Sequence, residues 1–430
     1  MGKSGIAAIE LLLAKGAKVR AVDQRPLDQL GPMGQRLTEL GVDLLPQAAE
    51  SFQDADMVVL SPGVPVDLAE LLPLAETDAA VIGEVELASA FLKGPVIGIT
   101  GANGKTTTTA MIGHILKENN VPAQVGGNIG TPPTSMVGNS RNDQWNVLEL
   151  SSFQLETIYN FRAKIAVCLN VTPDHLDRHH TFERYAAAKG RLFETQTEED
   201  FAVLNADDQT CVSYIGKTKA SGFWFSSTGP VIPGAWVKDG VIHVNNEKLM
   251  PAGDIPLAGA HNVENTMAAA VATHLAGLSL PEIASAVRTF PGVEHRLEFV
   301  RELNGVKYYN DSKATNVDAT EKAIDSFPGG LWIILGGKDK NSDYTVLRDK
   351  LKAKAKGVLL VGAAAEKIEG QLKNGLPLQH CGTIEAAVEK ARREATSGDI
   401  VLLAPACASF DQFQSYEHRG RVFKDVVNKL

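Results

Sequence analysis

An apolar segment that runs directly into a glycine-rich loop constrains the fold of this chain more than any other feature. Residues 95–109 read Pro-Val-Ile-Gly-Ile-Thr-Gly-Ala-Asn-Gly-Lys-Thr-Thr-Thr-Thr. Gly101 and Gly104 allow backbone N–H groups to turn toward an anion, and the first turn of the following helix has N–H groups without intrahelical partners. The succession of strand, loop and helix therefore predicts a phosphate-binding site.

The side chains of this loop favour a nucleotide triphosphate with a divalent cation. Lys105 can reach the β- and γ-phosphates, and the Thr106 hydroxyl is placed to hold Mg²⁺. The loop is shorter than the pattern Gly-x4-Gly-Lys-[Ser/Thr], because Ile99 stands where that pattern has a glycine. The residues expected to contact the nucleotide here are Gly101, Ala102, Asn103, Gly104, Lys105, Thr106 and Thr107.

Composition limits the class of protein. A chain of 430 residues is long enough for about three domains. The net charge of −9 argues against a dominant nucleic-acid or anionic-membrane surface. Four widely spaced cysteines, without a C-x-x-C pair, indicate neither a disulfide framework nor a zinc site. No apolar run approaches the roughly 20 residues of a membrane helix, and no targeting signal is evident, so we expect a cytoplasmic protein without nucleic-acid or membrane partners.

Strands rich in Val, Ile and Leu alternate with helical patterns almost throughout the chain, which predicts α/β domains with parallel sheets covered by helices on both faces. We expect three domains. Residues 1–93 form a Rossmann-like domain, residues 94–293 a central ATPase-type domain around the phosphate loop, and residues 294–430 a C-terminal Rossmann-like α/β domain.

The N-terminal domain is predicted to lack its first strand. The segment 2–5 and the amphipathic stretch 6–15 have the pattern of a dinucleotide-type turn and helix, and 18–23 would be strand two. We expect the natural reading frame to extend upstream through about six apolar residues; a polar upstream sequence or a stop codon would contradict this. Without that strand, strand two has an unpaired edge and the domain is less stable. Alternatively, the helix naturally begins the chain.

Two polar side chains of the central domain are expected near the phosphate loop. Glu149 lies toward the C-terminal end of the predicted strand 145–152, and His175 follows the predicted strand 165–170. Ligands of open α/β sheets gather beyond the carboxyl ends of the strands, where the phosphate loop also lies. A carboxylate and an imidazole there favour a second divalent ion, although Mg²⁺ prefers oxygen ligands. Taken alone, each is more often an ordinary polar loop residue.

Two further residues are ambiguous from the sequence. Lys189 lies in a helical segment, 185–191, and its spacing alone favours a solvated surface lysine. Asn265 lies near the start of an amphipathic helix that begins at about residue 261. An asparagine there can contact an adenine edge or cap the helix.

The third domain repeats the arrangement at strand ends. Strands predicted to end at Asn310, Leu335 and Ala404 each run into a loop dense in Lys, Ser, Thr and Asn. We expect these loops to share one sheet edge, and their composition suits a pocket for a small dicarboxylate amino acid. The alternative is the ordinary chemistry of caps and turns.

Together these motifs resemble the Mur ligase family of ATP-dependent amide ligases, which build the peptidoglycan stem peptide, and the similarity covers essentially the whole chain. Motifs at 149–156, 170–175, 310–316 and 405–413 are similar to those of the D-glutamate-adding member. Segment 310–316 discriminates best, because sister ligases carry other residues there. The resemblance implies UDP-N-acetylmuramoyl-L-alanine and D-glutamate as substrates, ATP, two Mg²⁺ sites and an acyl-phosphate intermediate. We expect a monomer.

The resemblance also implies roles for individual residues. Catalytic roles fall to Lys105, Glu149, His175, Lys189 and His295, and metal contacts to Thr106, Glu149, His175 and Lys189. Lys189 would be carbamylated by CO₂, which overrides its interpretation as a surface lysine. Further nucleotide contacts are Asn265, Arg296 and Asp311. Substrate contacts are Lys3, Ser4, Gln24, Arg25, Asn128, Ser151, Gln154, Lys313, Thr315, Lys340, Ser409, Phe410 and Tyr416. Lys338 departs from the family pattern, because some relatives have an acidic residue there.

Three alternatives remain open. A sister ligase would add another amino acid, and incorporation tests with D-glutamate, L-lysine and meso-diaminopimelate separate the two. A non-catalytic module would hold ATP and a UDP-sugar without turnover, but the intact Lys105, Glu149, His175 and Lys189 argue against it. A dehydrogenase is disfavoured because no complete G-x-G-x-x-G follows a strand.

Overall fold

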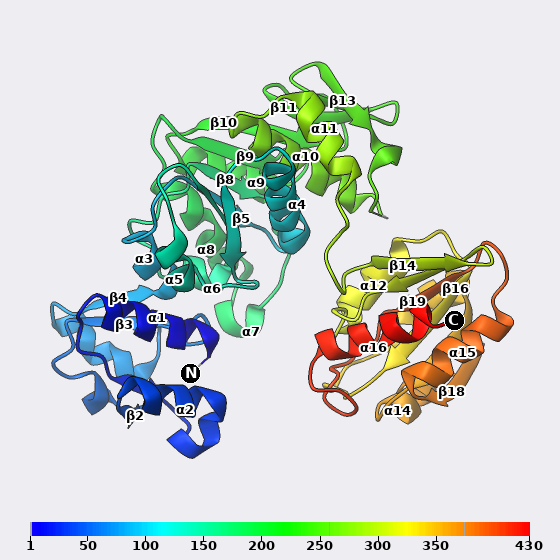
Figure 1. The fold of residues 1–430 in the computed structure, drawn as a ribbon, viewed down its shortest axis with the longest axis horizontal. Coiled ribbons are helices and arrows are strands. Elements are labelled where there is room, and N and C mark those ends of the chain that lie inside the picture. The colour runs from blue at the N-terminus through cyan, green and yellow to red at the C-terminus, as the bar shows by residue number, and fades with distance from the viewer. Residues whose placement is uncertain (1, 258, 374) are drawn as a thin grey trace. The chain divides into compact units, whose positions relative to one another are not determined.

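The computed structural model describes residues 2–257, 259–373 and 375–430 (Figure 1). It contains two compact units. The first comprises Met1–Ile255 with Val263–Phe290, and the second comprises Pro256–Asn262 with Pro291–Leu430. Within the described residues, no helix has the length and apolar character needed to cross a membrane.

The N-terminal part of the first unit contains two small parallel sheets, β1–β2 and β3–β4. The elements are α1 (Lys3–Ala14), β1 (Ala21–Asp23), α2 (Pro32–Leu40), β2 (Leu44–Pro46), β3 (Met57–Leu60), β4 (Ala80–Gly83) and α3 (Glu84–Ser89). In the described part of the chain, β1 pairs only with β2. This agrees with the expected unpaired edge of strand two, although that strand begins at Ala21 rather than at residue 18.

The remainder of the first unit is built on a sheet with the strand order β13-β12-β11-β10-β9-β8-β5-β7-β6. Its strands are β5 (Val96–Thr100), β6 (Ala123–Gly127), β7 (Trp145–Glu149), β8 (Ile165–Cys168), β9 (Phe201–Asn205), β10 (Ser221–Ser226), β11 (Gly234–Lys238), β12 (Val241–Val244) and β13 (Glu247–Pro251). Its helices are α4 (Lys105–Glu118), α5 (Pro133–Met136), α6 (Ser152–Leu155), α7 (Leu176–His179), α8 (Phe182–Glu194), α9 (Gln209–Ser213), α10 (His261–Leu275) and α11 (Leu280–Arg288).

The sheet is parallel from β6 to β11, and β12 and β13 are antiparallel additions at one edge. This antiparallel edge differs from the expected parallel sheet. Its turns contain Asp239-Gly240 and Asn245-Asn246, and all four residues have positive φ. Such residues favour tight hairpins, whose twist matches that of the strands they connect. The signal was therefore present in the sequence.

The order β8-β5-β7 places the phosphate loop between two parallel neighbouring strands, at the carboxyl edge of the sheet. β5 lies between β8 and β7, and Ile99 is paired with Glu149. All five residues of β5 are buried and the first four are apolar, which is typical of a strand that is covered on both faces. α4 follows the loop and packs against β6, β7 and α11 (Figure 1), with Met111 and Ile112 fully buried.

The second unit has one sheet of strand order β14-β15-β19-β16-β17-β18, in which only β14 is antiparallel to its neighbour. Its elements are β14 (Glu298–Leu303), β15 (Val306–Asn310), α12 (Val317–Asp325), β16 (Leu331–Gly336), α13 (Arg348–Lys354), β17 (Ala355–Val361), α14 (Ala365–Leu372), β18 (Leu378–Gly382), α15 (Ile384–Glu394), β19 (Ile400–Leu403) and α16 (Tyr416–Asn428).

Helices cover both faces of this second sheet, as predicted. Side chains alternate along β16, because successive strand residues point to opposite faces. Ile333 packs in a core with residues of α12, α13 and α14, whereas Trp332 and Ile334 pack in a core with residues of α15 and α16. The sheet order also makes β15, β19 and β16 neighbours, so the three predicted loops share one edge.

Candidate functional site

The glycine loop has the conformation that a phosphate cradle requires. Gly101 and Gly104 have φ values of +150° and +85°, which favour glycine. The Lys105 ammonium group donates hydrogen bonds to the carbonyls of Gly101 and Ala102, both at 2.9 Å. The loop is thus folded back on its own lysine, beside the N-terminus of α4, where unpaired N–H groups favour an anion.

Two asparagines outside the loop hold it in place. Asn170 accepts from the Ala102 N–H through its carbonyl and from the Asn103 N–H through Oδ1, both at 2.8 Å. Asn265 lies so close that a Cβ on Gly104 would come within 2.3 Å of its Oδ1. Asn265 is predicted to contact the adenine, whereas the role of Asn170, the first residue of the motif at 170–175, was not predicted.

Glu149 presents a buried carboxylate beside the loop. Its Oε1 accepts from Asn128 Nδ2 at 2.9 Å, and its carbonyl accepts from the Asn128 N–H at 2.8 Å. Its Oε2 is buried and has no hydrogen-bond partner among the described residues. A buried carboxylate oxygen without a partner is costly, so this atom fits a cation site. Asn128, expected at the UDP edge, is therefore also the residue that orients Glu149.

Lys189 is buried, and its interpretation from spacing alone as a surface lysine is wrong. The side chain is 2% exposed on α8, and its Nζ donates to the Gly101 carbonyl at 2.8 Å. Burial, together with the nearby charge of Lys105, lowers the pKa of Lys189 to about 7. A substantial fraction of this amine is therefore neutral and nucleophilic near neutral pH.

His175 directly precedes α7 in the left-handed conformation, with φ +52°. Its imidazole is half exposed and 4.9 Å from the Phe153 ring. Across the described residues, no group of three or more His, Cys, Asp or Glu side chains could hold a metal ion. Glu149 and His175 therefore fit a cation only if other oxygen ligands, such as those of a phosphate, complete its coordination.

The predicted UDP-site residues of the N-terminal part lie on two elements. Lys3 and Ser4 form the first turn of α1, where backbone N–H groups lack intrahelical partners. Gln24 and Arg25 follow β1 directly, and Arg25 forms an ion pair with Asp23 at 3.2 Å.

Ser151 and Gln154 form a capping box at the start of α6. The Ser151 Oγ accepts from the Gln154 N–H at 3.3 Å, and the Ser151 N–H donates to Gln154 Oε1 at 3.0 Å. Both residues lie directly after Glu149, close to the phosphate loop. Their structural role is established by this box, and their predicted substrate contacts stay a prediction.

His295 is the most constrained of the predicted residues in the second unit. It is 2% exposed, with φ +65°. Asn310 Nδ2 donates to its Nδ1 at 2.9 Å, which assigns the proton to Nε2. That Nε2 has no hydrogen-bond partner among the described residues and lies 3.7 Å from Glu294 Oε1. Burial lowers the pKa of His295, so it offers a neutral donor.

Arg296 and Asp311, which are predicted to contact the nucleotide, lie beside His295; Asp311 is buried and Arg296 is partly exposed. Asp311 accepts from the Leu297 N–H at 3.3 Å, one residue beyond Arg296. Burial raises the pKa of Asp311 to about 6, against the opposing effect of Arg296. The Lys313 N–H donates to the His295 carbonyl at 3.1 Å, which joins the segments before β14 and after β15.

The predicted D-glutamate residues lie on the three loops that follow β15, β16 and β19. They are Thr315, Lys340, Ser409, Phe410 and, at the start of α16, Tyr416. Lys313, predicted as a substrate contact, lies on the first of these loops. Ser409 is buried, whereas Lys340 is exposed. Phe410 is 67% exposed.

Arg419 is a buried cation that was not predicted from the sequence. It is 1% exposed on α16. Its guanidinium donates to Ser312 Oγ at 2.9 Å, to the Ser312 carbonyl at 2.8 Å and to the Cys407 carbonyl at 3.1 Å. It therefore connects two of the three loops. The planar guanidinium presents several N–H donors in a fixed geometry, which suits a residue that connects two loops. Nothing in the neighbouring sequence distinguishes Arg419 from a surface arginine.

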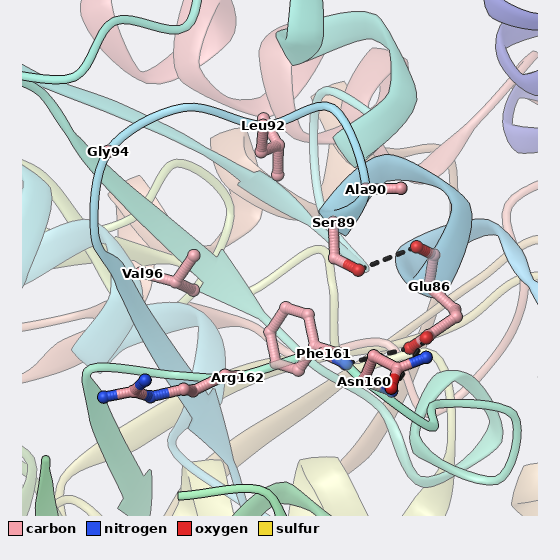
Figure 2. Close-up of a pocket in the computed structure, with 9 residues that line it drawn as sticks. All are labelled: Glu86, Ser89, Ala90, Leu92, Gly94, Val96, Asn160, Phe161 and Arg162. Atoms are coloured by element: carbon pink, nitrogen blue, oxygen red, sulfur yellow. Dashed lines mark hydrogen bonds between the residues drawn. The ribbon is translucent and has the colours of Figure 1, made fainter. Parts of the chain in front are cut away.

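A hollow of about 280 Å³ lies away from these residues (Figure 2). Its lining includes Val96 and Arg162, near the amino ends of β5 and β8, so it lies at the opposite sheet edge from the phosphate loop. Figure 2 shows Glu86 reaching the segment before β8. Its carboxylate accepts from the N–H groups of residues 159, 160 and 161 at 2.8–3.0 Å, so it anchors α3.

Comparison with known families accounts for all three parts of the chain. The Mur ligase MurD-like N-terminal domain matches residues 1–83. The Mur ligase middle domain matches residues 99–273. The Mur ligase glutamate ligase domain matches residues 295–407. The matches follow one another along the chain, and the middle one includes the glycine loop.

Individual relatives agree with these matches. A UDP-N-acetylmuramoylalanine–D-glutamate ligase of Solibacter usitatus is 58% identical over 430 residues, covering 100% of this chain and 96% of the relative. The structure of the UDP-N-acetylmuramate-alanine ligase of Thermotoga maritima has a TM-score of 0.62 at 18% identity, and the match covers 100% of this chain and 98% of that structure. A Thermotoga maritima MurF ligase in complex with ADP has a TM-score of 0.61 at 18% identity, and the match covers 95% of this chain and 98% of that structure. This chain belongs to the Mur ligase family.

Proposed function

We propose that this chain is an ATP-dependent ligase that joins D-glutamate to UDP-N-acetylmuramoyl-L-alanine and releases ADP and phosphate. The observation that carries the proposal is the group around the glycine loop: Lys105, the partly unpaired Glu149 carboxylate and the buried Lys189 converge there. The 58% identical UDP-N-acetylmuramoylalanine–D-glutamate ligase of Solibacter usitatus supports these substrates.

The reaction requires activation of a carboxylate. The L-alanine carboxylate attacks the γ-phosphorus of ATP, ADP leaves, and an acyl phosphate forms. The D-glutamate amine then attacks the acyl carbon, a proton is lost, and the tetrahedral intermediate collapses to the amide and phosphate. Negative charge develops on oxygen in both steps, so positioned cations and backbone N–H groups are the main requirement. Lys105 and the N-terminus of α4 supply them.

Thr106, Glu149 and His175 would hold Mg²⁺ in two sites, with Lys189 completing the second. Bound Mg²⁺ would neutralise charge on the phosphate oxygens. Glu149 Oε2 contributes an anionic oxygen without a competing partner, and Asn128 holds the other oxygen in place. The His175 imidazole is half exposed and therefore accessible to a ligand.

Lys189 would act as a carbamate. Its neutral amine adds to CO₂ and loses a proton, which converts a cation into an anionic oxygen ligand. The lowered pKa supports this step, because only the neutral amine reacts. Because the carbamate is negatively charged, its formation would also remove the repulsion between Lys189 and Lys105.

We propose the following division of the chain. Residues 1–93 bind the UDP-sugar through Lys3, Ser4, Gln24 and Arg25, with Asn128, Ser151 and Gln154 contributing from the neighbouring domain. Residues 94–293 bind ATP, with Asn265 at the adenine. Residues 294–430 bind D-glutamate, with Lys313, Thr315, Lys340, Ser409, Phe410 and Tyr416 as its contacts, and carry Arg296 and Asp311 for the nucleotide. His295 would donate a hydrogen bond from Nε2 near the reacting centre. A cytoplasmic monomer is expected.

Phosphate release tests this function. The full chain is incubated with ATP, Mg²⁺ and UDP-N-acetylmuramoyl-L-alanine, with D-glutamate, L-glutamate, L-lysine, meso-diaminopimelate or no amino acid. We expect release that requires D-glutamate and is abolished in Lys105→Ala. If phosphate release requires one of the other amino acids instead, that amino acid is the substrate and D-glutamate is not. If no amino acid supports release, the chain has no ligase activity.

A further inference from the structure

A buried histidine at the end of α7 has no task in the chemistry above, yet it joins several elements of the site. His179 is 2% exposed. Its Nε2 lies 2.9 Å from Ser152 Oγ, and its Nδ1 lies 3.2 Å from Glu156 Oε1. These contacts connect α7, which follows His175, to α6 and the residue after it, which follow Glu149.

Aromatic contacts extend from His179 in two directions. Its imidazole stacks on Phe153, with centroids 5.3 Å apart and planes 13° apart, and meets the edge of Tyr185 at 5.4 Å. Phe153 in turn lies 4.9 Å from the His175 ring, and the Tyr185 ring lies 4.6 Å from Lys189 Nζ. His179 is therefore the middle of a continuous series of contacts between His175 and Lys189.

A third connection reaches the N-terminal part of the same unit. Arg178 Nη2 donates to Glu156 Oε2 at 3.1 Å and to the Val64 carbonyl at 3.2 Å. Its guanidinium lies over Phe153 at 5.6 Å. Glu156 thus binds His179 with one oxygen and Arg178 with the other, and the network ties the loop after β3 to α7.

The order Ser152, His179, Glu156 is that of a hydrolytic triad, but the structure excludes a nucleophilic role. Ser152 is 2% exposed at the start of α6, so its hydroxyl is inaccessible to an acyl group. The fully bonded and stacked imidazole instead suits a fixed support, because its position is determined by four neighbours at once.

We propose that His179 is a positioning residue that sets His175 and Lys189 relative to each other for metal binding. This inference depends on the proposed function, which gives those two residues their ligand roles. Substitution of His179 is expected to displace the His175 turn and the Tyr185 ring, without removing any group that contacts metal or substrate.

Three variants separate the contributions of hydrogen bonding and packing. His179→Phe keeps a ring between Phe153 and Tyr185 but removes both hydrogen bonds. His179→Gln keeps one donor and one acceptor and should restore part of the function. Ser152→Ala removes a single hydroxyl and should have the mildest effect on folding. His180→Phe is the matched control, because the neighbouring imidazole is 57% exposed.

The test is direct binding of Mn²⁺ to the full chain with a non-hydrolysable ATP analogue and bicarbonate, followed by electron paramagnetic resonance. We expect His179→Phe to weaken binding about tenfold or more, as loss of a support behind a metal ligand does, and Ser152→Ala to weaken it about fivefold. His179→Gln should bind more tightly than His179→Phe, and His180→Phe should match the unmodified chain.

A merely structural histidine would lower the thermal unfolding midpoint and the active fraction without changing the Mn²⁺ dissociation constant. Unchanged Mn²⁺ binding in both His179→Phe and Ser152→Ala would overturn the positioning role. The two proposals fail separately. If the unmodified chain shows no D-glutamate-dependent phosphate release, the proposed function is wrong, whereas release with unchanged Mn²⁺ binding in the variants contradicts only the role of His179.

Discussion

Replacement of Lys189 by methionine should stabilise the protein while abolishing its activity. The ordinary lysine pKa is 10.5, and burial lowers the pKa of Lys189 to about 7. Between these values the unfolded chain holds a proton that the folded chain has released. The unfolded state therefore binds more protons, and the free energy of unfolding rises with pH across this window. Methionine fills a similar volume and does not titrate.

The magnitude follows from the two pKa values. Relative to a neutral side chain of the same size, the lysine costs roughly 4 kcal/mol of folding free energy at pH 7.5 and roughly 1 kcal/mol at pH 9.5. Loss of the hydrogen bond to Gly101 costs the variant about 1 kcal/mol at either pH. The Gly101 carbonyl still accepts from Lys105. The net advantage of Lys189→Met is thus about 3 kcal/mol at pH 7.5 and close to zero at pH 9.5.

Urea unfolding in CO₂-free buffers measures this difference, since carbamylation would change the charge of Lys189. Unmodified chain and variant are compared at pH 7.5 and 9.5, with the exposed Lys238→Met as a control that should show no pH-dependent difference. A stability advantage of Lys189→Met that is the same at both pH values, or no advantage at all, would refute the argument that the folded chain holds a desolvated amine with a lowered pKa.

The other predictions concern the loop, the metal site and the second unit. Gly104→Ala, whose Cβ would lie 2.3 Å from Asn265 Oδ1, should reduce kcat/KM for ATP about 100-fold or more, whereas Gly138→Ala, with open space around it, should have no effect on phosphate release. Glu149→Gln should raise the half-saturating Mg²⁺ concentration more than tenfold in the same assay; an unchanged Mg²⁺ dependence would remove Glu149 from the metal site. Arg419→Lys should destabilise the second unit by about 2 kcal/mol in urea, and unaltered unfolding would mean that the three guanidinium bonds contribute nothing.

Local patterns predicted the elements that carry the site. The strand and loop at residues 95–109, the strand that ends at Glu149 and the strand that ends at Asn310 all form as expected. Each is an apolar run followed by a turn or cap, and that information is contained within a few consecutive residues. The shared edge of the three C-terminal loops also followed, because parallel strands place their carboxyl ends together.

The sequence alone determined which chemical groups stand at the ends of which strands, and therefore that phosphate chemistry takes place at a sheet edge. Only the tertiary structure decided their surroundings. Lys189 contacts Gly101 from 88 residues away, and Arg419 contacts Ser312 from 107 residues away. Burial, pKa and the choice of partner depend on such distant contacts, which have no signature in the residues around either member. A buried lysine with a lowered pKa and an ordinary surface lysine have the same sequence pattern, and the packed fold distinguishes them.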